Sequence, residues 1–183
     1  MSHPKTGERV TFVRTSDETG GRFCELELIA LPGTRPAAAH IHPEQLERFT
    51  IHSGRVRVRL GRGESDHGAG ETVVVEPGTP HTWTAVGHEE LHLTARIEPA
   101  LNAERFFEDF FALAEAGKTN RAGVPTPLHL AVLLADNPGF LYLEKPPLRV
   151  QKAMVRALAP LGRALGYGRR QDGEGGIRTH EAV

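Results

Sequence analysis

The sequence predicts a mainly β protein, a sandwich or barrel of short strands, that ends in α-helices. Residues 1–100 contain short runs rich in valine, threonine and aromatic residues, separated by glycine and proline. Within several of these runs apolar and polar residues alternate, which gives a strand one buried face and one wet face. Beyond residue 100 the apolar residues recur at spacings of three and four instead, which is typical of amphipathic helices.

The strands are expected where the alternation is strongest. Over residues 55–60, Val56, Val58 and Leu60 alternate with three arginines, so the apolar side chains should face the core. The same pattern predicts strands over residues 23–31 and 91–97. Turn signals rich in glycine and proline separate the strands. These turn signals lie at residues 32–33, 53–54, 61–63, 68–70, 77–78 and 87.

Three helices are expected after the β region. Asn102 can cap the first helix, which should run to about residue 116. A proline-bounded apolar segment over residues 126–136 predicts the second helix. The third helix begins after residue 147, and Pro160 should kink or split it.

These patterns divide the chain into three parts. Residues 1–100 are expected to form a β-barrel domain, and residues 101–167 a helical C-terminal extension. Residues 168–183 are polar and rich in glycine, so we expect a disordered tail. A chain of 183 residues has room for one main domain with such an extension.

Charge, cysteine content and the N-terminal residues limit the expected partners and compartment. The formal net charge of −1 gives no global attraction to nucleic acid, so no nucleic-acid partner is expected. Cys24 is the only cysteine, so no internal disulfide can form, which fits a reducing cytosol. We expect Cys24 to be a small buried hydrophobic residue and not a nucleophile. The first residues lack the apolar core of a signal peptide, and a cytoplasmic location is expected.

Four residues form the candidate metal site: His40, His42, Glu47 and His81. The two histidines of the first segment are two residues apart, so on a strand both rings lie on the same face. Three imidazoles and one carboxylate are enough to hold a divalent transition metal and to leave coordination positions open. The sequence therefore predicts a metal site, although ten histidines in the chain make a chance pair of this kind an alternative.

The residues around Glu47 and His81 indicate that both side chains point inward. Glu47 alternates with Phe49 and Ile51, which places the carboxylate on the apolar side of its strand. His81 shares a face with Trp83 by the same rule. A charged carboxylate without a partner would be unfavourable in such a pocket, and a bound cation would remove that cost.

The two segments resemble the conserved motifs of the cupin superfamily. The first motif of that family is matched by Gly33, His40, His42, Glu47 and Gly54, with Gly33 one residue further upstream than is usual. The second motif is matched by Gly70, Pro77, Gly78 and His81, with Glu76 in place of the usual first proline and Ala85 in place of the usual asparagine. The resemblance covers roughly residues 20–98, and all four ligand positions carry residues that can bind a metal.

The resemblance implies a fold and a cofactor. The fold would be a small double-stranded β-helix, or jelly-roll cupin barrel, followed here by C-terminal α-helices. Members of the family bind Fe, Mn, Ni, Zn or Cu between two sheets, through the positions that His40, His42, Glu47 and His81 occupy here. The same fold serves dioxygenases, decarboxylases, isomerases, storage proteins and regulators, so fold and ligands do not fix the reaction.

Three functions are compatible with these features. The first is a metal-dependent oxygenase-type enzyme, an oxidoreductase such as a dioxygenase, that acts on a small organic substrate. Phe49 and Trp83 would then shape the substrate pocket, although ordinary core packing is the interpretation that we favour for both. No general base or other catalytic residue is assigned. The alternatives are a non-catalytic metal- or ligand-binding module and a metal-dependent isomerase or epimerase.

The C-terminal segment 145–170 is basic, and apolar residues recur along it. The helix could lie on anionic lipid, or it could pack on the barrel or on a second subunit with its charges in solvent. We favour packing, because Pro160 interrupts the segment and aromatic anchors are few. A homodimer is expected by analogy with cupin-like domains. The apolar stripe consists of Val150, Met154, Leu158, Leu161 and Leu165.

Overall fold

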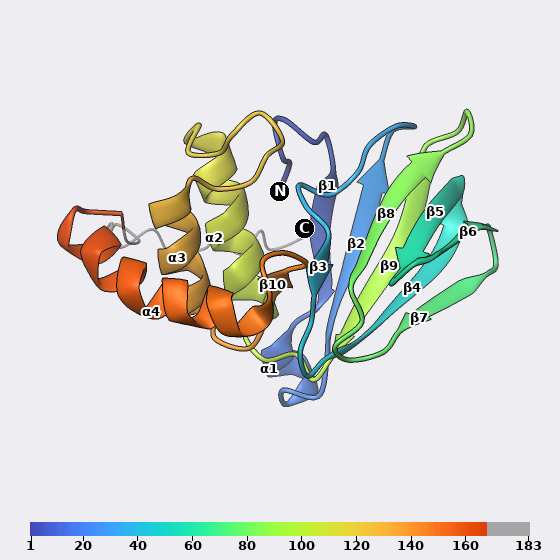
Figure 1. Cartoon of the computed structure of the whole chain (residues 1–183). Coiled ribbons are helices and arrows are strands. Elements are labelled where there is room, and N and C mark those ends of the chain that lie inside the picture. The colour runs from blue at the N-terminus through green and yellow to red at the C-terminus, as the bar shows by residue number, and fades with distance from the viewer. Residues whose placement is uncertain (168–183) are drawn as a thin grey trace, which may run out of the picture.

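The computed structural model describes residues 1–167 and contains two antiparallel β-sheets that face each other, with helices at one side (Figure 1). The predicted tail, residues 168–183, lies outside the described residues. The first sheet has the strand order β1 (Arg9–Arg14), β2 (Cys24–Ala30), β9 (Leu91–Glu98), β4 (Leu46–Ser53) and β7 (Thr72–Val75). The second has the order β10 (Tyr142–Leu143), β3 (His40–Ile41), β8 (His81–Val86), β5 (Arg55–Leu60) and β6 (Gly63–Gly68).

The predicted fold class, a mainly β jelly roll with C-terminal helices, is confirmed, although the two sheets remain separate and do not close into one continuous barrel. A short helix, α1 (Ser16–Thr19), connects β1 to β2. The C-terminal helices are α2 (Ala103–Glu115), α3 (Pro127–Asp136) and α4 (Leu148–Ala164). Among residues 1–167, no helix is long and apolar enough to cross a membrane.

The core lies between the two sheets, where the alternating residues of the strands meet. In β4, Glu47, Phe49 and Ile51 are buried and Arg48 is exposed, as the alternation predicted. Cys24 in β2 is fully buried, and burial raises the pKa of its thiol to about 12. A thiol that stays protonated at neutral pH is not a nucleophile, which agrees with its predicted packing role.

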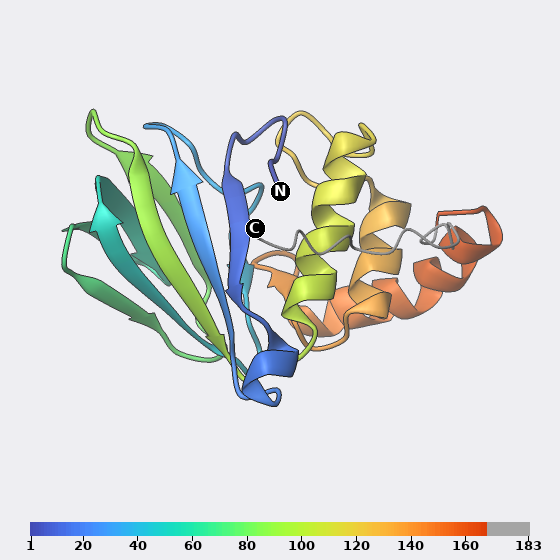
Figure 2. The same ribbon diagram turned by 180° about the vertical axis from the view of Figure 1, so that it is seen from behind.

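Helix α2 covers the open side of the sandwich beside β1, as the reverse view shows (Figure 2). The rings of Phe107 in α2 and Phe12 in β1 are 6.4 Å apart, in an edge-to-face arrangement. The start of α2 is held differently from the prediction. The side chain of Asn102 makes no cap hydrogen bond and instead donates to Oδ1 of Asn137, at 2.6 Å, which joins the start of α2 to the end of α3.

Helix α4 continues through Pro160, so the predicted split does not occur. Pro160 lies on the exposed side of α4, where solvent can hydrate the carbonyl that loses its partner. The packing face of α4 also differs from the predicted stripe. Ala159 and Gly162 are buried, whereas Val150 and Met154 are exposed.

Small residues explain which face of α4 packs against α3. A Cβ atom added to Gly162 would lie only 2.8 Å from Cγ2 of Val132, so the two helices approach as closely as glycine allows. Leu161 and Leu165 are exposed as well, whereas Leu148 and Val155 pack against the core. The homodimer and the membrane contact of this segment stay predictions.

The helical region also contributes a strand to the second sheet. In β10, Tyr142 pairs with Ile41 and Leu143 pairs with His40. The side chain of Gln151 in α4 holds β10 in place, because it donates to the carbonyl of Leu143 at 2.7 Å and accepts from the amide of Leu143 at 3.0 Å. The backbone around His40 is therefore supported from the C-terminal helices.

Gly54, at the tight turn between β4 and β5, should be sensitive to substitution. Its φ is +72°, and an added Cβ would lie 2.6 Å from the carbonyl oxygen of Glu90. Backbone strain and overpacking together should lower the free energy of unfolding of Gly54→Ala by about 2–4 kcal/mol. Gly61→Ala is the matched control, because Gly61 has a φ of +56° but no atom within 4 Å of an added Cβ. Chemical denaturation would measure both, and equal losses would contradict the proposed clash.

Candidate metal centre

Strands from both sheets bring His40, His42, Glu47 and His81 together. His40 in β3 pairs directly with His81 at the start of β8, and His42 follows β3 by one residue. Glu47 comes from β4 in the facing sheet. One ligand atom from each of the four side chains lies within 4.8 Å of all the others. His42, Glu47 and His81 are buried, and His40 is half-buried.

Each of the three imidazole rings is fixed by a hydrogen bond from its Nδ1 atom to a backbone carbonyl oxygen. A carbonyl oxygen can only accept, so Nδ1 carries the proton and Nε2 is the nitrogen available to a metal. The acceptor of His42 belongs to the segment between α3 and β10, so the C-terminal region orients this ring. The distances are 3.1 Å from His40 to Ala38, 2.6 Å from His42 to Phe140 and 2.9 Å from His81 to Thr79.

Two atoms at the centre of the cluster lack hydrogen-bond partners. Oε2 of Glu47 and Nε2 of His81 are 2.9 Å apart but are not aligned as a hydrogen bond, and both are buried without a partner among the described residues. Oε2 of Glu47 also lies 3.8 Å from Nε2 of His42. Buried polar atoms are normally satisfied, and a cation between these atoms would satisfy them. The donor set and its geometry therefore fit a metal ion.

Burial and mutual charge set the protonation of the cluster. Burial, together with the charges of His81 and His42, lowers the pKa of His40 to about 3, and burial also lowers the pKa of His42. Burial acts to raise the pKa of Glu47, but the contact with His81 and the charges of the imidazoles outweigh it and lower that pKa. Neutral His40 and His42 and an ionised Glu47 are the forms that bind metal.

His81 is the one histidine of the cluster whose pKa is raised. Burial acts to lower it, but the close approach and the negative charge of Glu47 outweigh burial. Without a metal, the ring therefore tends to hold a proton on Nε2 facing Glu47. A metal that binds Nε2 must displace this proton.

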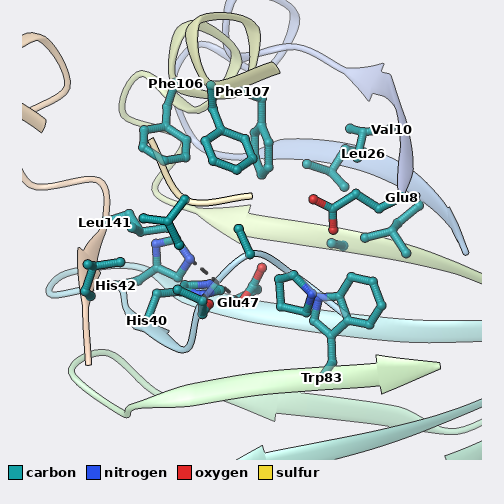
Figure 3. A pocket seen from close by; sticks show the side chains of 18 of the residues that line it. Glu8, Val10, Leu26, His40, His42, Glu47, Trp83, Phe106, Phe107 and Leu141 are labelled. Atoms are coloured by element: carbon teal, nitrogen blue, oxygen red, sulfur yellow. Dashed lines mark hydrogen bonds and ion pairs between the residues drawn. The ribbon is translucent and has the colours of Figure 1, made fainter. Parts of the chain in front are cut away.

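The cluster opens into a cavity of about 100 Å³ with mainly apolar walls (Figure 3). His40, His42 and Glu47 are part of its lining. Phe49 and Trp83, the two predicted substrate-contacting residues, are buried and also line the cavity. The other walls include phenylalanines of α2 and leucines of α3, so the C-terminal helices cover the cavity. These helical residues are Phe106, Phe107, Phe110, Leu130 and Leu133.

Sequence reasoning missed two buried residues near the N-terminus. Glu8 lines the cavity and is only 6% exposed. His3 is fully buried, its Nδ1 atom accepts from the amides of Lys5 and Thr6, and its Nε2 atom donates to the carbonyl of Gly123 at 3.3 Å. Neither residue lies in a motif or a periodic run, and the polar N-terminal segment looks solvent-exposed in sequence. Only the tertiary contacts of this segment identify them.

A sandwich of two antiparallel sheets with a three-histidine, one-glutamate cluster between them defines the cupin class of β protein. Residues 27–96 match the family model Cupin_2, described as "Cupin domain", and this part of the chain belongs to the cupin superfamily. The four clustered residues lie within the matched range, and the predicted resemblance is confirmed.

Several solved structures are similar to this chain at low identity. A conserved protein with a double-stranded β-helix domain from Klebsiella pneumoniae is 22% identical, over 51% of this chain and 73% of that chain, with a TM-score of 0.46. A predicted oxalate decarboxylase from Thermotoga maritima is 16% identical over 50% and 80%, with a TM-score of 0.48. KdgF from Halomonas sp. is 14% identical over 55% and 86%, with a TM-score of 0.49. No curated protein matches the chain.

Proposed function

We propose that the protein is a metal-dependent enzyme of the oxygenase type that acts on a small, mainly apolar organic substrate. The observation that supports this most is that three of the four clustered side chains also line the cavity. A structural ion is usually enclosed by its ligands, whereas a catalytic ion keeps an open position that faces space for a substrate.

His40, His42, Glu47 and His81 would hold the ion, a divalent transition metal such as Fe, Mn, Ni, Zn or Cu. Four protein ligands leave about two positions on a six-coordinate ion. When bound, the ion would supply Lewis-acid or electron-transfer chemistry at those positions. The carbonyl contacts on the three Nδ1 atoms would keep the rings oriented with and without substrate.

The remaining lining residues would bind and shield the substrate. Phe49 and Trp83 supply flat apolar surface beside the cluster, and residues of α2 and α3 complete part of the apolar wall. Outside the cluster, Glu8 is the one titratable residue in the lining. Such a cavity suits dioxygen and an apolar substrate better than a reaction that needs several proton-transfer groups. Glu8 is also the observation that supports the second candidate, a metal-dependent isomerase or epimerase.

Nitric oxide tests whether an open metal position faces the cavity, because it is a diatomic molecule that binds ferrous iron. Protein loaded anaerobically with Fe(II) should give the paramagnetic resonance signal of an iron–nitrosyl species. Ala95→Leu should keep the iron but weaken the signal, because Ala95 is buried in the cavity wall and a larger side chain would fill the space. A fully iron-loaded wild-type protein that gives no signal would have a closed structural site, and the enzyme proposal would then be abandoned.

Oxygen uptake separates the two enzyme classes. With small phenols and carbonyl compounds as test substrates, an oxygenase should consume oxygen only in the metal-loaded state. Turnover of a compound without oxygen uptake would instead support the isomerase, which needs the metal but not dioxygen.

A further inference from the structure

Glu8 is a carboxyl group placed in an apolar cavity wall. It directly precedes β1, and its neighbours in the lining include Val10 of β1 and Leu26 of β2. Figure 3 shows its carboxylate pointing into the pocket, on the side opposite His40, His42 and Glu47. The cavity therefore has polar groups at two ends and apolar walls between them.

The carboxyl group of Glu8 has one polar neighbour, the hydroxyl of Thr6, and no charged partner among the described residues. Glu8 is nevertheless only 6% exposed. The hydroxyl of Thr6 is close enough to lower the pKa of Glu8, yet it is itself without a hydrogen-bond partner. Burial outweighs Thr6 and raises the pKa of Glu8 to about 7. An apolar residue would fill this position at lower cost, so the carboxyl needs a reason to be there.

We propose that Glu8 is the second polar anchor of the cavity and binds a carbonyl oxygen of a small substrate whose other end faces the metal cluster. This inference rests on the proposed function, because it places that substrate between the two ends of the same cavity. The substrate class is a small molecule with an aromatic or branched aliphatic body and an oxygen group at each end.

The chemistry of the cavity favours a carbonyl group over a cation. A neutral carboxylic acid donates its O–H to a carbonyl oxygen, and a ligand that displaces the remaining water favours the neutral form further. A cationic amine would require an ionised Glu8 and would bring a charge into an apolar space. The cavity of about 100 Å³ is smaller than a cavity of about 150 Å³ that holds benzene, so one six-membered ring is the upper limit for the body of the ligand.

Calorimetry on Zn(II)-loaded protein with three matched phenols tests the proposal. The probes are 4-hydroxybenzaldehyde, 4-methylphenol and 4-(aminomethyl)phenol, which carry a carbonyl, a methyl and an amine opposite the hydroxyl. Wild-type protein should bind the aldehyde about 10-fold more tightly than the methyl compound, the amount expected for one buried hydrogen bond. Glu8→Leu should remove this preference, and Glu8→Gln, which keeps a donor, should retain most of it.

The pH profile separates hydrogen bonding from a purely structural role. The preference of wild-type protein for the aldehyde should decline as pH rises past about 7, because an ionised Glu8 cannot donate. Glu8→Gln should show no such decline. The other titratable residues in the lining are His40, His42 and Glu47, and all three would be held by the metal in the loaded protein.

Several results would overturn the assignment. An unchanged aldehyde preference in Glu8→Leu would show that Glu8 is not the anchor. A preference for the amine would point to cation recognition instead, and absence of binding by all three probes would reject the substrate class. The readout needs neither turnover nor nitric oxide, so a failure of the oxygenase proposal and a failure of the Glu8 proposal give different results. Glu8→Leu should be at least as stable as wild type, because it replaces a carboxyl group in an apolar cavity wall with an apolar side chain.

Discussion

Replacing His42 with alanine should reduce the metal content to less than about a tenth of that of the wild-type protein. His42 is 3% exposed, and its ring is fixed by the hydrogen bond to the carbonyl of Phe140. Removing one of four ligands weakens the site, and the ion held only by Glu47 and the other two imidazoles should be largely lost during purification. Elemental analysis of wild-type and variant protein, purified side by side, measures the difference.

His52→Ala is the matched control for this experiment. His52 lies in β4, the strand that carries Glu47, but it is exposed and contacts the hydroxyl of Thr94 on the outer face. Its replacement should leave the metal content unchanged. A His42→Ala protein that is folded and still carries the wild-type amount of metal would show that His42 is not a ligand.

The metal-free protein should unfold at a midpoint roughly 10 °C below that of the protein at saturating metal. Binding at a concentration about 1,000 times the dissociation constant stabilises the folded state by about 4 kcal/mol, which is a shift of this size for a chain of this length. Glu47→Gln should show almost no shift, because the neutral amide no longer balances the charge of the ion. Scanning calorimetry with and without a chelator measures the shift. An equal midpoint for loaded and stripped wild-type protein would contradict a site in the folded core.

The rise of the thermal unfolding midpoint on metal binding should also grow with pH. The pKa of His81 is raised above its ordinary value, so in the metal-free protein a proton competes with the metal for Nε2. Metal-induced stabilisation is therefore small below that pKa and increases as pH rises through it. A shift that stays constant from about pH 6 to pH 8 would contradict the assignment of His81 as a ligand.

The sequence was sufficient to predict several strands and the clustering of the four candidate ligands, because these features depend on short-range patterns. Alternation assigned Glu47 to the inner face of β4 and Arg48 to the outer face, and the structure agrees. His40 and His42 have the spacing of side chains on one face of a strand, and His81 follows closely after a Pro-Gly turn. Both features can be identified from a few neighbouring residues. A period-two pattern fixes which side chains point inward, and the facing of the two sheets then brings Glu47 of β4 to the histidines of β3 and β8.

The packing of the helices could not be predicted in the same way. Helix α4 has two apolar strips, and the choice between them depends on how closely a partner helix can approach. The strip that contains the small residues Ala159 and Gly162 is the one that packs, because α3 fits closely against them. A pattern based on large apolar residues selected the exposed strip instead.

The parts of the site that sequence reasoning missed come from contacts between residues far apart in the chain. The carbonyl that orients His42 belongs to Phe140, and the strand beside His40 is β10. Glu8 is placed in the cavity by the pairing of β1 with β2, which no local feature of its own segment reveals. The predicted division at residue 100 separates segments that both contribute to one cavity.

The central claim is that His40, His42, Glu47 and His81 hold a transition metal ion. The most direct test is elemental analysis of the full chain purified without an affinity tag, before and after incubation with Mn, Fe, Co, Ni, Cu and Zn salts followed by exhaustive dialysis. The expected result is about one ion of a first-row transition metal retained per chain. Retention of less than about a tenth of an ion per chain for every metal tried would contradict the claim.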